Sequence, residues 1–276
     1  FDNPIYLKGF IRILIPLIMA SLGVAAAFKA PGTLDGLCGK TDEDNLGFTY
    51  AELVRRMAAC GVSPAEVTAL VFTHDHSDHY NGLATFRKRF PGVPLFANGD
   101  TADAIACATG VADGWNVFET ASTFPLADFR VTAFATSHDA ADPVGYLLED
   151  AGSALFVGTD TGFATLGVRD AFARATAAVL ESNHDPVLLE QSNRAESLKR
   201  RIRSRSGHLA NEEAADLVRT TPAPRLKTLL LAHLSEECNS PSLARKAMED
   251  ALAEIRRADV ALAVLDQHVP SALYEF

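Results

Sequence analysis

Short apolar runs that end abruptly in polar loops recur along most of this chain. Residues 69–73 (ALVFT) are mostly apolar and lead at once into histidines and aspartates, and residues 129–136 (FRVTAFAT) alternate between apolar and polar positions before Ser137. Runs of this length and composition predict strands with at least one buried face. The same reasoning predicts strands at 93–97, 144–148, 154–157, 177–180, 226–232 and 260–265.

Apolar residues recur at helical spacing between several of these strands. The segments 49–59, 83–90 and 242–257 have this pattern and predict helices. Neither an internal repeat nor a long Pro- or Gly-rich linker divides the sequence. The order of strand, polar loop and helix therefore predicts one α/β domain, whose polar loops gather at one edge of its sheet.

The first 47 residues depart from this pattern. Residues 8–27 are nearly all apolar after a basic start, which is typical of a secretory signal peptide and would make the protein exported. Pro16 interrupts the stretch, which is too short to predict a stable membrane association. A buried strand or helix and an altered first hairpin are the alternatives. We therefore divide the chain into an atypical apolar segment, 1–47, and a domain over 48–276.

The composition is that of a globular protein. Of 276 residues, 48% are hydrophobic and 22% charged, which excludes general disorder, collagen and coiled coils. Lys and Arg number 25 against 35 Asp and Glu, so the formal charge is −10 with the 8 histidines neutral. This charge argues against a protein that coats polyanions, so a role on nucleic acid needs a local basic patch or bound cations. The 4 cysteines form no C-x-x-C pair, which favours a reducing, cytoplasmic location.

Three histidines and an aspartate lie within six residues directly after the strand predicted at 69–73. They are His74, His76, Asp78 and His79 in the segment HDHSDH. Imidazole and carboxylate groups suit a divalent cation such as zinc, or manganese where more oxygen ligands take part. In an extended strand end His74 and His76 point the same way, whereas a turn would bring Asp78 and His79 to a second position. This one segment can thus supply two adjacent metal ions.

The segment T-H-D-H-S-D-H matches the H-x-H-x-D-H signature of the metallo-β-lactamase superfamily, and later segments continue the resemblance. His138 lies in T-S-H-D, Asp160 in G-T-D-T-G and His233 in L-A-H-L-S, in the order that the family has. The resemblance implies an α/β fold, a four-layer αβ/βα sandwich with two divalent metal ions (Zn or Mn) at one edge. It also implies the ligands, with His74, His76 and His138 on the first ion, Asp78, His79 and His233 on the second, and Asp160 bridging both.

Three further segments resemble the WalJ/YycJ group of this superfamily. They are E-S-N-H-D at 181–185, L-K-R-R-I-R-S-R-S-G-H-L-A-N at 198–211 and L-A-H-L-S-E-E-C-N at 231–239. The resemblance covers 48–276 and implies a metal-dependent phosphodiesterase acting on nucleic acid, as a 5′-3′ exonuclease on DNA rather than RNA. The group normally opens with a strand, a Gly/Ser-rich turn and an Asp near the metals, and 1–47 contains none of these.

Residues outside the ligand set are expected to complete the chemistry. Two adjacent metal ions can generate hydroxide at neutral pH and hold both the attacking oxygen and a phosphoryl oxygen. The leaving alkoxide needs a proton, and we expect His208 to donate it. Glu181 would orient this imidazole, as a Glu is thought to do with a similar Gly-His motif in the related tRNA-processing enzymes. The predicted ligand Asp78 is also expected to take part in catalysis. A purely structural His–Glu contact is the alternative.

Five more residues are candidates for substrate contact or support. His184 would contact a substrate phosphate or support the site, and Asp75 would support a ligand imidazole. The basic run 194–205 contains six Lys and Arg residues and one acid. We expect Arg200, Arg201 and Arg203 to contact substrate phosphates. The alternative is that the run is only a solvated face. Aromatic residues are not interleaved with this run, so base stacking and sequence-specific readout are not predicted.

Two other function classes are compatible with the same motifs. The first is a small-molecule hydrolase of this fold, such as a cyclic phosphodiesterase, a thioester hydrolase or a lactamase. Of these, the thioester hydrolase and the lactamase need neither the basic run nor the Gly-His motif. A diiron oxidoreductase or a metal-binding regulator would leave Glu181 and His208 without a task, and the diiron relatives carry Glu where this chain has His76. The sequence indicates no particular oligomeric state.

Overall fold

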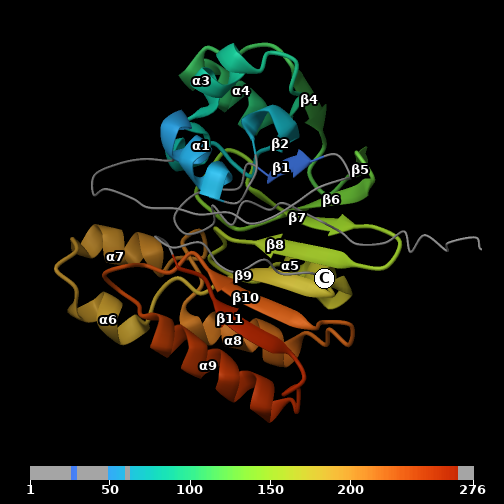
Figure 1. Ribbon diagram of the computed structural model, residues 1–276. Helices are drawn as coiled ribbons and strands as arrows, with labels where there is room; N and C mark the ends of the chain where they lie inside the picture. The colour runs from blue at the N-terminus through green and yellow to red at the C-terminus, as the bar shows by residue number, and fades with distance from the viewer. Residues whose placement is uncertain (1–25, 30–48, 60–62, 267–276) are drawn as a thin grey trace, which may run out of the picture.

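Two β-sheets packed against each other form the centre of the protein (Figure 1). The computed structural model describes residues 26–29, 49–59 and 63–266. In the smaller sheet the order is β1-β2-β3-β4, with β1 antiparallel to β2 and the other neighbours parallel. Its strands are β1 (Ala26–Lys29), β2 (Val67–Val71), β3 (Leu95–Asn98) and β4 (Trp115–Phe118).

The larger sheet joins an antiparallel half to a parallel half. Its order is β11-β10-β9-β8-β7-β6-β5, and the direction changes at β8, which is antiparallel to β7 and parallel to β9. Because β8, β9 and β10 are parallel, their carboxyl ends meet at one edge of the sheet. The strands are β5 (Thr123–Leu126), β6 (Phe129–Ala135), β7 (Val144–Glu149), β8 (Ala154–Gly158), β9 (Ala177–Glu181), β10 (Thr228–Ala232) and β11 (Ala261–Val264).

Alternate side chains along the strands fill two different cores. In β8, Leu155 and Val157 belong to the core between the sheets, whereas Phe156 belongs to the core on the outer face of the larger sheet. This period of two is what a sheet covered on both faces requires. The Tyr146 hydroxyl on β7 donates a hydrogen bond to the Phe72 carbonyl just after β2, which ties the two sheets together beside the histidine-rich loop.

Helices cover the outer face of each sheet, so the molecule has four layers. On the larger sheet, α5, α8 and α9 pack through a core that contains Phe172 and Met248. On the smaller sheet, α1, α3 and α4 pack through a core that contains Phe86 and Ile105. The αβ/βα sandwich predicted from the sequence is confirmed. The helices are α1 (Tyr50–Ala59), α3 (Leu83–Arg89), α4 (Gly99–Thr109), α5 (Leu166–Arg174), α8 (Asn211–Thr220) and α9 (Pro241–Glu254).

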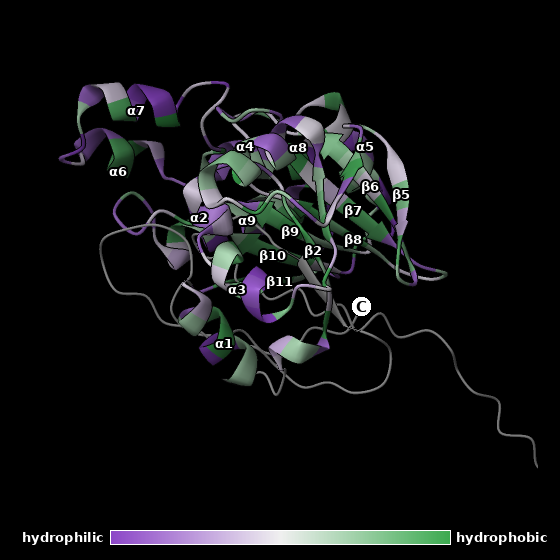
Figure 2. Cartoon of the chain, turned by 90° about the horizontal axis from the view of Figure 1, so that it is seen from above, coloured by the Kyte–Doolittle hydropathy of each residue, from purple (hydrophilic) through white to green (hydrophobic). Residues whose placement is uncertain are grey.

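Two short helices, α6 (Pro186–Gln191) and α7 (Glu196–Ile202), form a pair that stands apart from the sheets (Figures 1 and 2). Leu189 on α6 packs against Ile202 on α7 and against Cys238 in the loop after β10. The buried ammonium of Lys199 donates to the carbonyl oxygen of Glu190. These contacts hold the pair next to the carboxyl ends of the parallel strands.

The predicted strands and helices are present, with shifted ends. The helix predicted at 242–257 ends at Glu254, and Arg256 adopts a left-handed backbone (φ 58°) that cannot continue a helix. The strand predicted at 226–232 begins at Thr228. The apolar pattern did not predict the helices α4 to α8 or the strands β4 and β5.

The segment set apart at the N-terminus is described only in part. The signal-like stretch 8–27 lies outside the described residues except for its last two, which open β1. In β1, Ala27 lies opposite Leu70 of β2. Within the described part of the chain no helix has the length and hydropathy to cross a membrane. The signal-peptide interpretation and the division at residue 47 stay predictions.

Candidate metal centre

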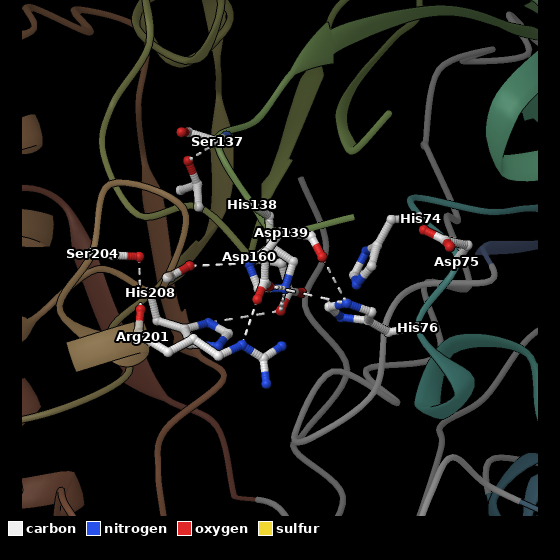
Figure 3. Close-up of polar contacts among 12 residues, drawn as sticks. His74, Asp75, His76, Ser137, His138, Asp139, Asp160, Arg201, Ser204 and His208 are labelled. Carbon is white, nitrogen blue, oxygen red and sulfur yellow. Dashed lines mark hydrogen bonds and ion pairs between the residues drawn. The ribbon is translucent and has the colours of Figure 1, made fainter. Parts of the chain in front are cut away.

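Polar loops from both sheets converge at one edge of the sandwich. His74, His76, Asp78 and His79 follow β2 of the smaller sheet. From the larger sheet come three residues, His138 after β6, Asp160 after β8 and His233 after β10. Figure 3 shows the side chains of His74, His76, His138 and Asp160 turned toward one another.

The seven predicted ligands form one continuous cluster. Nitrogen atoms of His74, His76 and His138 lie within 4.8 Å of one another, which brings together the three residues predicted for the first metal. His74, His79 and Asp160 form a second group within the same distance. The Asp78 carboxylate lies 3.5 Å from Nε2 of His79. The turn expected at Ser77 is the short helix α2 (Ser77–Tyr80), which carries Asp78 and His79.

Asp160 lies at the middle of this cluster. Its Oδ1 atom is 3.8 Å from Nε2 of His138 and 3.6 Å from Nε2 of His233, and its Oδ2 atom is 4.0 Å from Nε2 of His79. A carboxylate with imidazoles of both predicted ligand sets around its two oxygens has the position that a bridging ligand needs.

Two residues of the cluster have a strained backbone. Asp160 (φ 54°), two residues after the end of β8, and His233 (φ 59°), directly after β10, adopt the left-handed conformation. For residues other than glycine this conformation costs about 1 kcal/mol or more, and it persists where the surrounding structure requires it. Both strained positions are therefore at residues whose side chains belong to the cluster.

The donor atoms of the cluster fit divalent cations. Nε2 of His74 and Oδ2 of Asp160 are buried and have no hydrogen-bond partner among the described residues, which is costly unless a ligand takes them. Burial, and then the charge of His79, holds the pKa of His74 well below its usual value, so this imidazole is neutral and able to bind a cation. Six of the seven predicted ligands belong to groups of side chains close enough together to hold a metal ion, and the assignment of ligands to ions stays a prediction.

Hydrogen bonds on the opposite ring nitrogens orient several of these imidazoles. The Thr73 hydroxyl lies 3.1 Å from Nδ1 of His74 and 3.1 Å from Nδ1 of His79. Nδ1 of His138 lies 3.0 Å from the carbonyl oxygen of Gly207, which can only accept, so this nitrogen carries the proton. A proton on Nδ1 leaves the Nε2 lone pair for a metal.

Glu181 connects a predicted ligand with the predicted proton donor. Its Oε1 atom lies 2.8 Å from Nδ1 of His208 and 2.6 Å from Nδ1 of His233. The backbone amides of Thr161 and Leu209 donate to Oε2 at 3.1 Å. Both oxygens of this fully buried carboxylate are therefore satisfied by the protein, so Glu181 positions imidazoles and is not itself free to bind a metal.

The charges of the site stabilise one another. Burial on its own raises the pKa of Glu181, but the charges and hydrogen bonds of His208 and His233 outweigh it and bring the pKa to about 2. Burial on its own lowers the pKa of His233, but Asp160 and Glu181 raise it to about 10. In the same way the imidazoles of His233 and His79 hold the pKa of Asp160 well below its usual value despite its burial. The carboxylates are thus ionised at neutral pH.

A pocket of about 430 Å³ opens over the metal centre. Its wall includes Asp78 and Asp160 from the cluster, the predicted proton donor His208, and Arg194 and Arg201 from the basic run. The members of the basic run differ in their contacts. Arg201 is hydrogen-bonded through Nε to Asp139, and Arg194 lies 2.8 Å from Glu237.

Four of the five residues predicted for substrate contact or support lie outside the pocket wall. Arg200 is exposed on α7, and Arg203 forms ion pairs of 2.6 and 3.1 Å with Glu190 and Glu196. Asp75 accepts a 3.0 Å hydrogen bond from the backbone amide of Ala141, which fixes the loop after β6. His184 is buried behind the site, and burial lowers its pKa to about 4. The roles predicted for these residues stay predictions.

The structure adds residues that the sequence reasoning missed. Thr73 and Gly207 contact the imidazoles of predicted ligands. Arg194, a member of the basic run that was not among its three predicted contacts, lines the pocket. Asp139 follows the ligand His138, its carboxylate lies 3.5 Å from Nε2 of that histidine, and its backbone oxygen lies 3.1 Å from Nε2 of His76. The sequence feature that could have indicated Asp139 is its position in the T-S-H-D motif, directly after His138. No local sequence motif indicated the contact between Glu181 and His233, which are 52 residues apart.

Comparisons with known proteins agree with this architecture. A family model described as "Beta-lactamase superfamily domain" matches residues 48–233. The chain is 34% identical over 191 residues to exodeoxyribonuclease YycJ of Bacillus anthracis, covering 68% of this chain and 72% of that protein. It is 31% identical over 212 residues to exodeoxyribonuclease WalJ of Streptococcus pneumoniae, covering 75% of this chain and 78% of that protein.

A solved structure shows the same fold at low sequence identity. The metallo-β-lactamase fold protein YhfI from Bacillus subtilis superposes with a TM-score of 0.60 at 15% identity, over 88% of this chain and 98% of that one. The match to the family model covers more than half of the chain, and the two curated relatives are each more than 30% identical over most of their length. The chain therefore belongs to the metallo-β-lactamase superfamily, as a metal-dependent hydrolase of its WalJ/YycJ group.

Proposed function

We propose that this protein is a phosphodiesterase that digests DNA from an end in the 5′-3′ direction and uses two divalent cations, Zn or Mn. The observation that carries the proposal is the Glu181–His208 pair. Its imidazole lines the pocket, with Nδ1 3.8 Å from Oδ1 of Asp160 at the middle of the metal centre. Cleaving a phosphodiester expels an alkoxide that needs a proton, whereas a thiolate leaving group does not.

The residues of the chain have separate tasks in this reaction. The cations, when bound, supply a hydroxide nucleophile and neutralise charge on the phosphoryl oxygens. Asp160 lies between the two ligand sets and fixes their separation. Glu181 holds Nδ1 of His208, so Nε2 is the ring atom available to deliver a proton to the leaving oxygen. Arg201 offers a guanidinium in the same pocket for a phosphate of the chain.

Two observations favour DNA and cleavage at an end. Both curated relatives described above are named exodeoxyribonucleases. The pocket, at about 430 Å³, is in the range that encloses a single small molecule, so it suits one terminal nucleotide better than the middle of a duplex. The direction of digestion rests on the resemblance to the WalJ/YycJ group.

The test is a substrate panel with metal-loaded protein. It contains DNA labelled at the 5′ or the 3′ end, RNA of the same sequence, a cyclic phosphodiester and a thioester, with Asp160→Ala as the inactive control. We expect DNA labelled at the 5′ end to release a labelled mononucleotide at once and DNA labelled at the 3′ end to shorten stepwise. Faster turnover of the cyclic phosphodiester or the thioester, or cuts inside the DNA, would contradict the proposal.

A further inference from the structure

One face of α7 carries an exposed leucine and lines the pocket. Leu198, Arg201 and Ile202 are three and four residues apart, which places them on the same side of the helix, and all three belong to the pocket wall. Leu198 is 36% exposed, whereas the neighbouring Lys199 is only 8% exposed. This distribution is the reverse of the usual one, in which lysine lies outside and leucine inside.

Packing of the helix does not explain the exposure of this leucine. The α6–α7 pair is held together by Ile202 and by the hydrogen bond from Lys199 to the Glu190 carbonyl. Among the described residues, Leu198 belongs to none of the buried hydrophobic clusters. Leu234, from the loop after β10, lines the pocket with it. Leu198 and the edges of Ile202 and Leu234 therefore form a small apolar wall in an otherwise charged pocket.

Two regions of the pocket differ in chemistry and suit the two chemically different parts of a nucleotide. A phosphodiester is anionic and suits the metal centre and Arg201. A nucleobase has two apolar π-faces that gain free energy when water leaves them, and the apolar wall is the part of the pocket that can cover such a face. The acids Glu236 and Glu237 also line the pocket, and Glu237 is paired with Arg194 at 2.8 Å. The apolar wall carries no charge of its own and is therefore the side of the pocket that suits a base.

We propose that Leu198, flanked by Ile202 and Leu234, is the platform on which the base of the nucleotide being released lies. This inference rests on the proposed DNA exonuclease function. An aliphatic side chain covers the face of any base and makes no hydrogen bond to base edges, so the platform accepts all four bases. It favours a terminal nucleotide, because a base inside a duplex already stacks on two neighbours.

Two oligonucleotides that differ in one base test the platform. The first carries a normal 5′-terminal nucleotide, and the second carries a tetrahydrofuran abasic unit in its place. For the wild type we expect kcat/KM to be about fivefold higher on the first, at the low end of what base stacking contributes. Leu198→Ala should bring this ratio close to one, because it lowers the rate on the first substrate much more than the rate on the abasic one, and Leu198→Phe should raise the ratio.

A matched control and a binding measurement complete the experiment. Leu243→Ala on α9 removes a leucine that is 38% exposed and does not line the pocket, so it should keep the wild-type ratio. Fluorescence anisotropy with metal-free protein should show the same base-dependent preference in Kd, lost in Leu198→Ala. If the wild type cleaves DNA and Leu198→Ala keeps the base preference, or slows both substrates equally, the platform is wrong. If the wild type cleaves neither oligonucleotide, the proposed function itself fails and the platform fails with it.

Discussion

At the scale of single residues, Glu181 serves two imidazoles at once. Its Oε1 atom contacts both His208 and His233, at 2.8 and 2.6 Å, and no part of the residue is exposed. A carboxylate behind a ligand histidine fixes the ring and raises its basicity, and the same carboxylate here also holds the expected proton donor. The metal centre and the proton donor therefore share one anchor, although their motifs are 25 or more residues apart along the chain.

His208 and Glu181 can be separated by their effects on metal binding. We predict that His208→Gln keeps its metal content and loses about 10²- to 10⁴-fold in turnover, because it removes only the proton donor. Glu181→Gln should lose turnover and also bind metal more weakly, because it releases His233 as well. Metal analysis of purified protein and turnover of a DNA substrate measure the two effects. Equal loss of metal in both variants, or normal turnover of His208→Gln, would exclude the division of roles.

The convergence of the seven predicted ligands could be anticipated from the sequence, because each lies in a short motif after a strand. Residues that act across the fold could not be found in this way. Asp139 meets Arg201 across 62 positions, and the amide of Ala141 meets Asp75 across 66. A local pattern carries no information on such contacts, since they depend on how the loops pack. Arg200 and Arg201 are adjacent in sequence, and only their positions on α7 show that Arg201 faces the pocket.

At the scale of elements, α7 is tied to the metal-binding loop after β6. The guanidinium of Arg201 on α7 is hydrogen-bonded to the carboxylate of Asp139, the residue after the predicted ligand His138. Asp139 is itself partly exposed, and the hydrogen bond and charge of Arg201 lower its pKa against the effect of burial. A substrate phosphate would meet Arg201 at the rim of the metal centre, because both line the same pocket.

The salt dependence of DNA binding should distinguish the arginines of the basic run. We predict that Arg201→Ala weakens binding and lowers the slope of log K against log salt by about one, as expected when one phosphate contact is removed. Arg203→Ala is the matched control, because Arg203 is paired with Glu190 and Glu196 outside the pocket wall. Titrations of a labelled oligonucleotide at several salt concentrations measure both slopes. If Arg203→Ala changes the slope more than Arg201→Ala does, the phosphate contact lies at Arg203, outside the pocket wall, and the prediction is wrong.

Most strands of the larger sheet were predictable from the sequence, whereas the partly exposed strands β4 and β5 and several helices were not, for a physical reason. Strands such as β8 are buried on both faces and are continuously apolar, so they are visible without context. By contrast, α6 and α7 have only 6 and 7 residues, too few for a helical period to be recognised. In α4 the residues are mostly small, and its apolar face is correspondingly weak. Tertiary packing, which the local pattern does not contain, stabilises these helices.

At the scale of the whole molecule, the candidate metal centre joins the two sheets. His74, His76, Asp78 and His79 follow a strand of the smaller sheet, whereas His138, Asp160 and His233 follow strands of the larger one. Two divalent ions would add four positive charges to a chain whose formal charge is −10, at the point where acids and imidazoles are concentrated. The net charge therefore argues against a protein that coats nucleic acid and is compatible with one that holds phosphate at a single site.

Metal binding should stabilise the entire sandwich, because the ligands cross-link its two halves. At a free metal concentration 100 times Kd, one site contributes about 2.7 kcal/mol to the free energy of unfolding, so two sites should raise Tm by roughly 10 °C. Thermal unfolding of chelator-treated and metal-loaded protein measures this shift. Asp160→Ala should lose most of it, whereas His184→Gln, which alters a buried histidine outside the ligand cluster, should keep it. An equal shift in Asp160→Ala and the wild type would mean that the stabilising ions bind elsewhere.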